Sequence, residues 1–535
     1  MPNNPSTSAS PPKLPFLPFG RRDSRHMLIA QGDTLWLALA SEGAPSMIPT
    51  APRPAGLFEL TVLSSGNPVP YTYTADISVL ELKASGGVAR ITHDTQVGAL
   101  RIEAEGISLR FDGKTSSGVS SLNTPDGPVV SIGGGRYLFS ARRGTITFDD
   151  TWVLNAFGSV VPVVDIAPAG GIIELVVYEL PGDTIIPAPT GSFDSRAAEN
   201  AAEFSAFDSS IVSAPPQYSK LRDEAVYSLW LNSKKLADGN HCITPNRITS
   251  SMAEAHRQAL ASFAFRDFDS AFELLMSLPE SSPPLRGFAV TRMIDDGLLD
   301  GVELDMLRKL YHELEATAKW WRDNRTMPGA ALSYYAYRFE SGHPNPSTFT
   351  VGAPVIAPDL NAYLVLLYEA LSQLAANLGD NAASDKFALG AKERLDAMLS
   401  DLWDGERFFA VNVYSGERES AESQTTYAPL IQNEIPLILG RRLPGDVFDK
   451  LARSFGEKLN NPPEGAGRSS DQTLQYAAVL LGLVYAEPLE VLGKYTSLVA
   501  GAFKPEWMQY ASDPITGAVM LAAVSKAFGM GTRIN

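Results

Sequence analysis

The pattern of hydrophobic and polar residues changes along the chain. Between Asp23 and Pro189, short runs such as TLWLALA, ISVLELK and ALRIEAE are apolar or alternate apolar with polar residues, and clusters of Gly, Pro, Asp and Ser separate them. This period of two, with regular turn signals, is typical of strands in an antiparallel sandwich. We therefore predict a β-sandwich domain over residues 21–190. Residues 1–20 are rich in Pro, Ser and Asn, and we predict a flexible arm there.

The second part of the chain has a helical period. After a segment rich in Pro, Ala and Ser, which we interpret as a linker over residues 191–216, apolar residues recur every three or four positions. Eleven segments show this pattern: 217–235, 252–278, 284–296, 303–324, 358–378, 384–402, 423–440, 444–458, 470–485, 487–502 and 518–529. Eleven segments are close to six antiparallel pairs, and the absence of a fixed repeat argues against a solenoid. Residues 217–535 are therefore predicted to form an (α/α)6 barrel.

Composition narrows the classes of function. Of the 535 residues, 44% are hydrophobic and 19% are charged, which is typical of a globular protein. The formal net charge of −16 argues against nucleic acid or an anionic membrane as a partner. A single cysteine, Cys242, excludes an internal disulfide and fits a reducing compartment. No run is apolar enough to span a bilayer and no secretory signal is visible, so a cytoplasmic location is expected.

The sequence favours no metal or cofactor. The six histidines are scattered, and no cluster of His, Cys and carboxylates has the spacing of metal ligands. No glycine-rich nucleotide loop follows a predicted strand. We therefore expect a small-molecule substrate, and the oligomeric state is left open.

One segment carries the strongest functional signal. From Tyr334 to Leu364 the chain reads YYAYRFESGHPNPSTFTVGAPVIAPDLNAYL. It resembles the active-site segment of trehalase and the processing α-glucosidases (glycoside hydrolase families 37 and 63), which reads roughly E-S-G-W-D-N-S-P and then A-P-D-L-N-A-Y-L. Glu340 to Gly342 and Asn345 match, but Pro344 stands where the family has its general acid, an Asp.

Further local matches occur in the order that the family has. They are Tyr218 to Lys235, residues 284–321, Trp403-Asp404-Gly405 followed by Arg407 to Phe409, and Asp513 to Gly517. Together the matches span about residues 217–530, and the family also has a β-sandwich before its barrel. The resemblance implies the fold of the six-hairpin glycosidases and an activity on glycosides.

The chain departs from the family where the chemistry belongs. Inverting members use two carboxylates about 6.5–9.5 Å apart. Besides Pro344 at the acid position, Tyr510 stands at the base position, and His256-Arg257 aligns with a sugar-binding Trp-Asp pair. Residues Glu464 to Asp471 take the place of the family's Tyr-Trp-Arg-Gly-Pro-Trp segment. Loss of one acid or base group typically costs about 10²–10⁴-fold in rate, so these changes indicate that standard hydrolysis has been abandoned.

Four residues are candidates for catalysis. Glu340 is either a substitute proton donor or a structural carboxylate that accepts bonds from loop amides. His343 replaces a Trp beside the acid position, and it is either an acid–base group or a loop histidine. Tyr510 occupies the base position, and Asp513 either takes part in the chemistry or orders the Asp-Pro-x-Thr-Gly turn.

Nine residues are candidates for substrate binding. The His256-Arg257 pair could hold an anionic or carbonyl group, or it is simply a polar helix face. Asp359 either faces the pocket, as the family implies, or caps a helix. The carboxylate at position 434 lies either at an exposed edge or inside the barrel. The full set is His256, Arg257, Tyr335, Tyr337, Arg338, Asp359, Asn361, Glu434 and Trp507.

Three functions remain open on these observations. The first is a repurposed enzyme that uses acid–base groups for a cyclisation, isomerisation or dehydration of a small organic molecule. The second is a divergent inverting glycosidase that uses Glu340 and another carboxylate. The third is a binding protein without catalytic activity.

Overall fold

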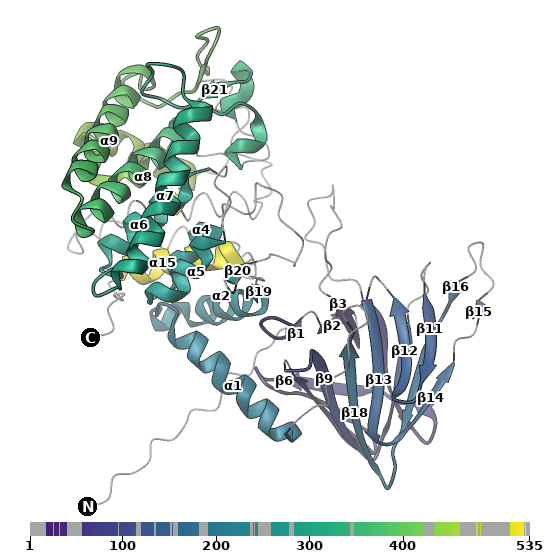
Figure 1. Cartoon of the computed structure of the whole chain (residues 1–535). Helices are drawn as coiled ribbons and strands as arrows, with labels where there is room; N and C mark the ends of the chain where they lie inside the picture. Colours follow the sequence, from purple (N-terminus) through teal and green to yellow (C-terminus); the bar gives the residue numbers. More distant parts are fainter. Residues whose placement is uncertain are drawn as a thin grey trace, which may run out of the picture. The chain divides into compact units, whose positions relative to one another are not determined.

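The protein forms two compact units, residues 1–208 with 246–248, and residues 209–245 with 249–535. The structure is a computed structural model (Figure 1). It describes residues 18–39, 56–149, 152–153, 159–180, 191–235, 239, 241–243, 258–277, 283–342, 347–420, 433–460, 478–479, 482, 514–528 and 530, apart from 25, 32, 95, 114–118 and 133–134 within these ranges.

The first unit contains two antiparallel sheets of eight strands each. One sheet runs in the order β1 (Phe19–Gly20), β2 (His26–Gln31), β3 (Thr34–Leu39), β4 (Gly56–Ser64), β10 (Ser108–Gly113), β17 (Val163–Ala167) and β14 (Thr145–Asp149), and β5 (Asn67–Pro68) pairs with β4. The other runs β11 (Ser120–Thr124), β12 (Gly127–Ile132), β13 (Gly135–Arg143), β18 (Ile172–Glu179), β9 (Ala99–Glu105), β8 (Gly87–Asp94), β7 (Leu80–Ala84) and β6 (Tyr71–Ala75). A separate pair joins β15 (Trp152–Val153) to β16 (Ser159–Val160).

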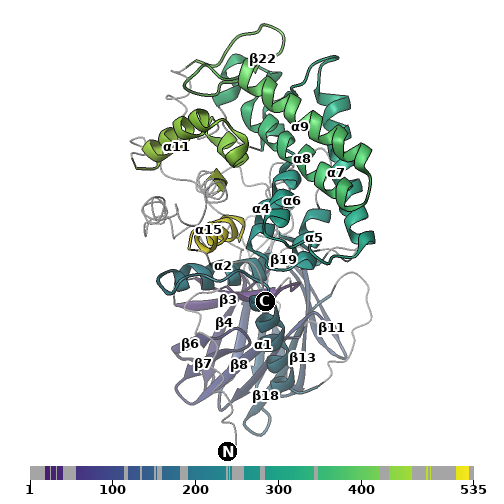
Figure 2. The ribbon, with the colours of Figure 1, turned by 90° about the vertical axis from the view of Figure 1, so that its left-hand side faces the viewer.

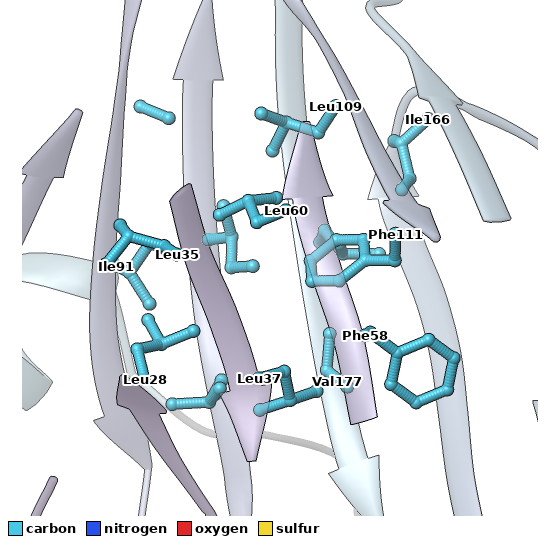
Figure 3. Packing of buried hydrophobic residues seen from close by; sticks show 14 of the residues in the cluster. Leu28, Leu35, Leu37, Phe58, Leu60, Ile91, Leu109, Phe111, Ile166 and Val177 are labelled. Atoms are coloured by element: carbon cyan, nitrogen blue, oxygen red, sulfur yellow. The ribbon is translucent and has the colours of Figure 1, made fainter. Parts of the chain in front are cut away.

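The two sheets share one apolar core, as the alternation of the sequence predicts. Every second residue of β4 enters it, namely Phe58, Leu60 and Val62, and all three are fully buried. Figure 3 shows this cluster, in which Leu35 of one sheet and Val177 of the other contribute side chains. Burial of this apolar surface is the main driving force for the sandwich, and the prediction of a β-sandwich is confirmed.

A helix occupies much of the segment that we interpreted as a linker. Helix α1 (Phe193–Ser209) has 17 residues, although its sequence is rich in Ala and Ser. It is held to the sheets by polar contacts: Asn200 Nδ2 donates to the carbonyl of His93 at 2.9 Å, and Arg90 pairs with Asp194 at 2.9 Å. Polar anchors of this kind leave little apolar periodicity, which is why the sequence pattern does not reveal the helix.

The second unit is helical (Figures 1 and 2). Its described helices are η1 (Pro216–Tyr218), α2 (Ser219–Asn232), α4 (Gln258–Ala261), η3 (Ser262–Ala264), α5 (Phe268–Met276), α6 (Leu285–Asp295), α7 (Leu304–Arg325), η4 (Arg338–Ser341), η5 (Ser347–Val351), α8 (Pro358–Asn377), α9 (Asn381–Asp401), η6 (Ile435–Arg442), α11 (Gly445–Asn460) and α15 (Pro514–Ala527). Short strands pair β19 (Ser233–Lys235) with β20 (His241–Ile243), and β21 (Val355–Ile356) with β22 (Val411–Asn412).

Helix α8 lies at the centre of the described part of this unit. It packs against α6, α7, α9 and η6, and every residue from Pro358 to Leu367 is buried. The approach to α6 is very close, because a Cβ atom on Gly287 would lie 2.3 Å from Leu367 Cα. The N-terminal helix α2 packs against the C-terminal helix α15, and Lys526 of α15 pairs with Asp296 at 2.5 Å. These contacts join the two ends of the helical unit, as a closed ring requires.

Two predicted helices differ in detail. The segment 252–278 is predicted as one helix, but its described part breaks at Phe265, which is extended and pairs with Ile211. Helix α5 then begins at Phe268, and the carboxylate of its N-cap residue, Asp267, accepts a hydrogen bond from Ser270 N at 2.8 Å. The described end of segment 423–440 is a 3₁₀ helix with a left-handed Gly440. Segments 470–485 and 487–502 lie almost wholly outside the described residues.

The close contact at Gly287 predicts a large effect of one methyl group. Gly287→Ala should lower the free energy of unfolding by about 1–3 kcal/mol, because α6 must move away from α8. Urea denaturation followed by circular dichroism measures the change. Gly445→Ala is the matched control, since nothing lies within 4 Å of a Cβ at that position. Equal stability of the two variants would contradict the packing described here.

Candidate active site

Residues 333–342 and 347–359 form the described part of the motif that leads into α8. Its two arms are joined, because Tyr335 and Val355 exchange two backbone hydrogen bonds of 2.9 Å each. Val355 in turn pairs with Asn412 in the β21–β22 ladder. The arrangement is a small three-stranded patch beside the start of α8, and it fixes where each candidate side chain lies.

Asn361 anchors this segment to α8. Its Oδ1 accepts bonds from Ser333 N at 2.9 Å and Arg394 Nη1 at 2.7 Å, while its Nδ2 donates to the carbonyls of Ser333 and Ala357 at 3.0 and 2.9 Å. An amide side chain has two donors and two acceptor positions, so these four bonds use all of them. These contacts give Asn361 a structural role and leave none of its polar groups available to a substrate.

Glu340 is buried and carries an ion pair. Arg325 donates to its Oε1 from Nε at 2.8 Å and from Nη2 at 2.5 Å, and Ala336 N donates to its Oε2 at 2.6 Å. The same bonds raise the pKa of Arg325. Because both carboxylate oxygens are engaged, this geometry matches the structural alternative of the sequence analysis. It closes the turn that leads into η4.

Asp359 has a different environment. Tyr335 Oη donates to its Oδ2 at 3.1 Å, but its Oδ1 is buried without a hydrogen bond of good geometry. Burial raises the pKa of this carboxyl from 3.8 to about 6, and the charge of Glu419 acts in the same direction. The amides of Leu360 and Asp359 and the Tyr335 hydroxyl lower the pKa, but by less than burial raises it. A carboxyl with these properties is half protonated near pH 6.

The neighbours of Asp359 are themselves buried polar groups. Burial raises the pKa of Tyr335 and of Tyr363, and the charge of Asp359 raises both further. Tyr335 lies against Trp321 and Phe349, with ring centroids 6.0 and 6.2 Å away. The surroundings are therefore aromatic and of low dielectric, which strengthens each electrostatic interaction.

The remaining described candidates are divided between the surface and the interior. Tyr337 is 46% exposed and Arg338 is also exposed, with its guanidinium 5.3 Å from the centroid of the Phe339 ring. Glu434 is buried and is held by Ser454 Oγ at 2.7 Å and Lys458 Nζ at 2.9 Å. It joins η6 to α11, so its partners account for its position.

Six of the candidates lie outside the described residues, and so does Pro344. They are His256, Arg257, His343, Trp507, Tyr510 and Asp513. Among the residues that are described, no group of three or more His, Cys, Asp or Glu side chains could hold a metal ion. No helix in the described part of the chain is both long and apolar enough to cross a bilayer.

The structure adds residues that the sequence reasoning missed. Arg325 neutralises Glu340, Arg394 holds Asn361, and Glu419 is a second buried carboxylate near Asp359. Only the position of Arg325 at the end of a predicted helix offered a signal, because the other two lie far along the chain from the motif. Contacts between distant segments are invisible to a reading of local patterns.

Comparison with known families bears on this segment directly. The model of the mannosylglycerate hydrolase MGH1-like glycoside hydrolase domain matches residues 276–437, which include the whole segment from Ser333 to Asp359. The chain carries a glycoside hydrolase-like domain. No curated protein matches the sequence.

Solved structures share the fold of this chain at low identity. A bacterial glucoamylase complexed with acarbose matches over 98% of this chain and 97% of its own, with 10% identity and a TM-score of 0.50. The family GH92 α-mannosidase of Bacteroides thetaiotaomicron, in complex with mannoimidazole, matches over 94% and 81%, with 12% identity and a TM-score of 0.51. These likenesses show the fold, a β-sandwich followed by the helices of an (α/α)6 glycosidase. The chain spans 51% of a sialidase chain, at 14% identity and a TM-score of 0.41.

The ion pair between Arg325 and Glu340 predicts that removal of the arginine costs more stability than neutralisation of the glutamate. Arg325→Met should lower the free energy of unfolding by about 3 kcal/mol, because it leaves a buried carboxylate without its counter-charge. Glu340→Gln should cost less, since a neutral amide can still accept the Ala336 N–H bond. The double variant should be more stable than the sum of the single effects predicts. Thermal denaturation tests this, with Arg322→Met, an exposed arginine of the same helix turn, as control.

The carboxyl of Asp359 predicts a dependence of stability on pH. The unfolded pKa is near 3.9 and the folded pKa is about 6, so the folded state binds the proton more tightly. Stability from this group is therefore lost as the pH rises through 6, by about 0.8 kcal/mol between pH 5.5 and 8.0. Asp359→Asn should lack this component in urea denaturation. Asp380→Asn, at the exposed cap of α9, controls for the lost charge. An unchanged pH dependence in Asp359→Asn would contradict the raised pKa.

Proposed function

We propose that this chain is an enzyme that cleaves a glycosidic bond, with Asp359 as the proton donor. The observation that carries the proposal is the Asp359 carboxyl itself: Oδ1 is buried without a hydrogen bond of good geometry, Oδ2 is held by Tyr335, and the pKa is about 6. It lies within the glycoside hydrolase-like segment. A buried polar atom without a partner calls for an explanation, and a reactive role supplies one.

The chemistry of glycosides requires such a group. The leaving oxygen of the sugar must be protonated as the bond breaks, so the acid must hold its proton at the working pH. Enzymes achieve this by placing a carboxyl in a poorly solvated, aromatic site that raises its pKa. In this proposal Tyr335 orients the carboxyl through Oδ2, and Oδ1 presents the proton.

The names of similar proteins support a class of substrate. The matching family model is named for mannosylglycerate hydrolase, and the two similar structures are a glucoamylase and an α-mannosidase. We therefore propose a mannoside or glucoside as the substrate. Glu340 is not assigned the role of acid, because Arg325 and the Ala336 amide already occupy its oxygens.

A second function is favoured by specific residues of the sequence. Pro344 stands where the family has its acid and Tyr510 where it has its base. These replacements favour an enzyme that keeps the fold but uses Asp359 for proton transfer in a cyclisation, isomerisation or dehydration of a small metabolite. The third candidate, a binding protein without activity, would leave the raised pKa of Asp359 without a chemical use.

The role of Asp359 as proton donor is tested by comparing substrates whose leaving groups differ in their need for a proton. Wild type, Asp359→Asn and Glu340→Gln are assayed with nitrophenyl and dinitrophenyl α-mannosides and α-glucosides, and with mannosylglycerate and trehalose. Asp359→Asn should lose about 10²–10⁴-fold in kcat on the natural glycosides. It should retain more activity on the dinitrophenyl substrates, whose leaving group departs without a proton. Glu340→Gln, checked for folding by circular dichroism, should retain activity in proportion to its folded fraction.

Tyr335→Phe provides an independent check. Its hydroxyl lowers the pKa of Asp359, so its removal should move the alkaline fall of activity to higher pH. Full activity of Asp359→Asn on every glycoside would overturn the assignment. A folded wild type that hydrolyses no glycoside would overturn the glycosidase proposal and favour the second function.

A further inference from the structure

Three exposed aromatic side chains lie near one end of the helical unit. Among the described residues of the chain, seven large hydrophobic side chains are exposed. Three of them are aromatic, and all three lie on the segments that flank the β21–β22 ladder: Tyr337 at 46%, Phe339 at 63% and Tyr414 at 78% exposure. Figures 1 and 2 show this ladder at the end of the helical unit opposite α15. We call these three residues the aromatic end.

Strand pairing joins the two segments that carry these aromatic residues to β21. Tyr335 pairs with Val355 on one edge of β21, and Asn412 pairs with Val355 on the other. Both pairings are antiparallel, so the outer segments run in the same direction, and Val413 N bonds the carbonyl of Pro354 at 3.0 Å. Tyr337 and Tyr414 therefore each follow by two residues a position that pairs with Val355, one on either side of β21.

The backbone that carries these rings is firmly held. Asn412 Oδ1 accepts bonds from Tyr414 N and Ser415 N at 2.9 Å each, and its Nδ2 donates to the carbonyls of Val351 and Gly352 at 3.1 and 3.2 Å. On the other side, the bond from Ala336 N to Glu340 fixes the turn that contains Tyr337 and Phe339. Aromatic rings on a fixed backbone lose little conformational entropy when a ligand stacks on them.

The chemistry around the rings favours a sugar. The residues beside them are polar and exposed: Arg338, Ser415, Glu417 and Arg418. Aromatic faces set among hydrogen-bonding groups suit a pyranose, which has an apolar C–H face and a rim of hydroxyls. A peptide helix or a membrane would need a continuous apolar surface, and the net charge of −16 opposes an anionic bilayer.

We propose that Tyr337, Phe339 and Tyr414 form a stacking surface for a neutral oligosaccharide chain. The inference rests on the proposed function, because Tyr335, whose backbone belongs to the same patch, donates from Oη to Asp359 Oδ2 at 3.1 Å. The substrate class is then a glycan longer than a disaccharide, whose remote units bind the aromatic end while one glycosidic bond lies at the acid.

Affinity electrophoresis of the full chain tests the surface without any turnover. Native gels contain soluble starch, α-mannan or no polysaccharide, and the wild type should be retarded by starch or mannan. Phe339→Ala and Tyr414→Ala should each weaken binding about tenfold, the size of effect that loss of one stacking ring has in nucleic-acid recognition. Leu389→Ala, a hydrophobic residue of α9 that is 56% exposed, is the matched control and should bind as the wild type does.

The outcomes separate this inference from the proposed function. Retardation without hydrolysis of aryl glycosides would keep the surface and reject the chemistry. Hydrolysis without retardation by either polysaccharide would overturn the surface and leave the chemistry. An equal loss in Leu389→Ala would also overturn the surface, as would sedimentation data showing that the aromatic variants only change the self-association of the chain.

Discussion

The candidate site depends on one buried side-chain amide, that of Asn361, whose donors and acceptors are all used in hydrogen bonds. Asn361 lies in the first turns of α8, where every side chain is enclosed, and it binds the loop at Ser333 through both its oxygen and its nitrogen. Because a buried amide without partners is costly, the loop and the helix must adopt one relative position. That position brings Tyr335 to Asp359 and sets the turn of Glu340. The geometry of the candidate site thus follows from a residue whose own polar groups are all hydrogen-bonded.

The two buried acidic residues of the motif, Glu340 and Asp359, have different surroundings. Glu340 is as buried as Asp359, but a guanidinium and a backbone amide surround it. Asp359 faces a tyrosine hydroxyl and a second carboxylate in place of a cation. The carboxylate of Glu340 is paired with a guanidinium, whereas burial raises the pKa of Asp359.

The sequence predicted the elements of the fold better than the site. The alternation in β4 and the three-to-four spacing of apolar residues in α8 both result from burial of side chains in a core. Burial of this kind can be recognised from neighbouring positions in the sequence. The break at Phe265 left no trace, because its cause is pairing with Ile211, more than fifty residues away. The helix of residues 193–209 was hidden by polar anchoring. For the site, the motif located Asp359 and Glu340, but their difference arises from Arg325 and Glu419, which no spacing connects to them.

The contact between α2 and α15 has a consequence for biosynthesis. The first of these helices ends at Asn232 and the second begins at Pro514, so about 280 residues separate two segments that pack together. At a translation rate of about 5–20 residues per second, the earlier helix waits on the order of 15–60 s for its partner. During that interval its apolar face is available to chaperones or to other nascent chains. The sandwich can complete its core before α15 is made, whereas the ring closes only after α15 has been synthesised.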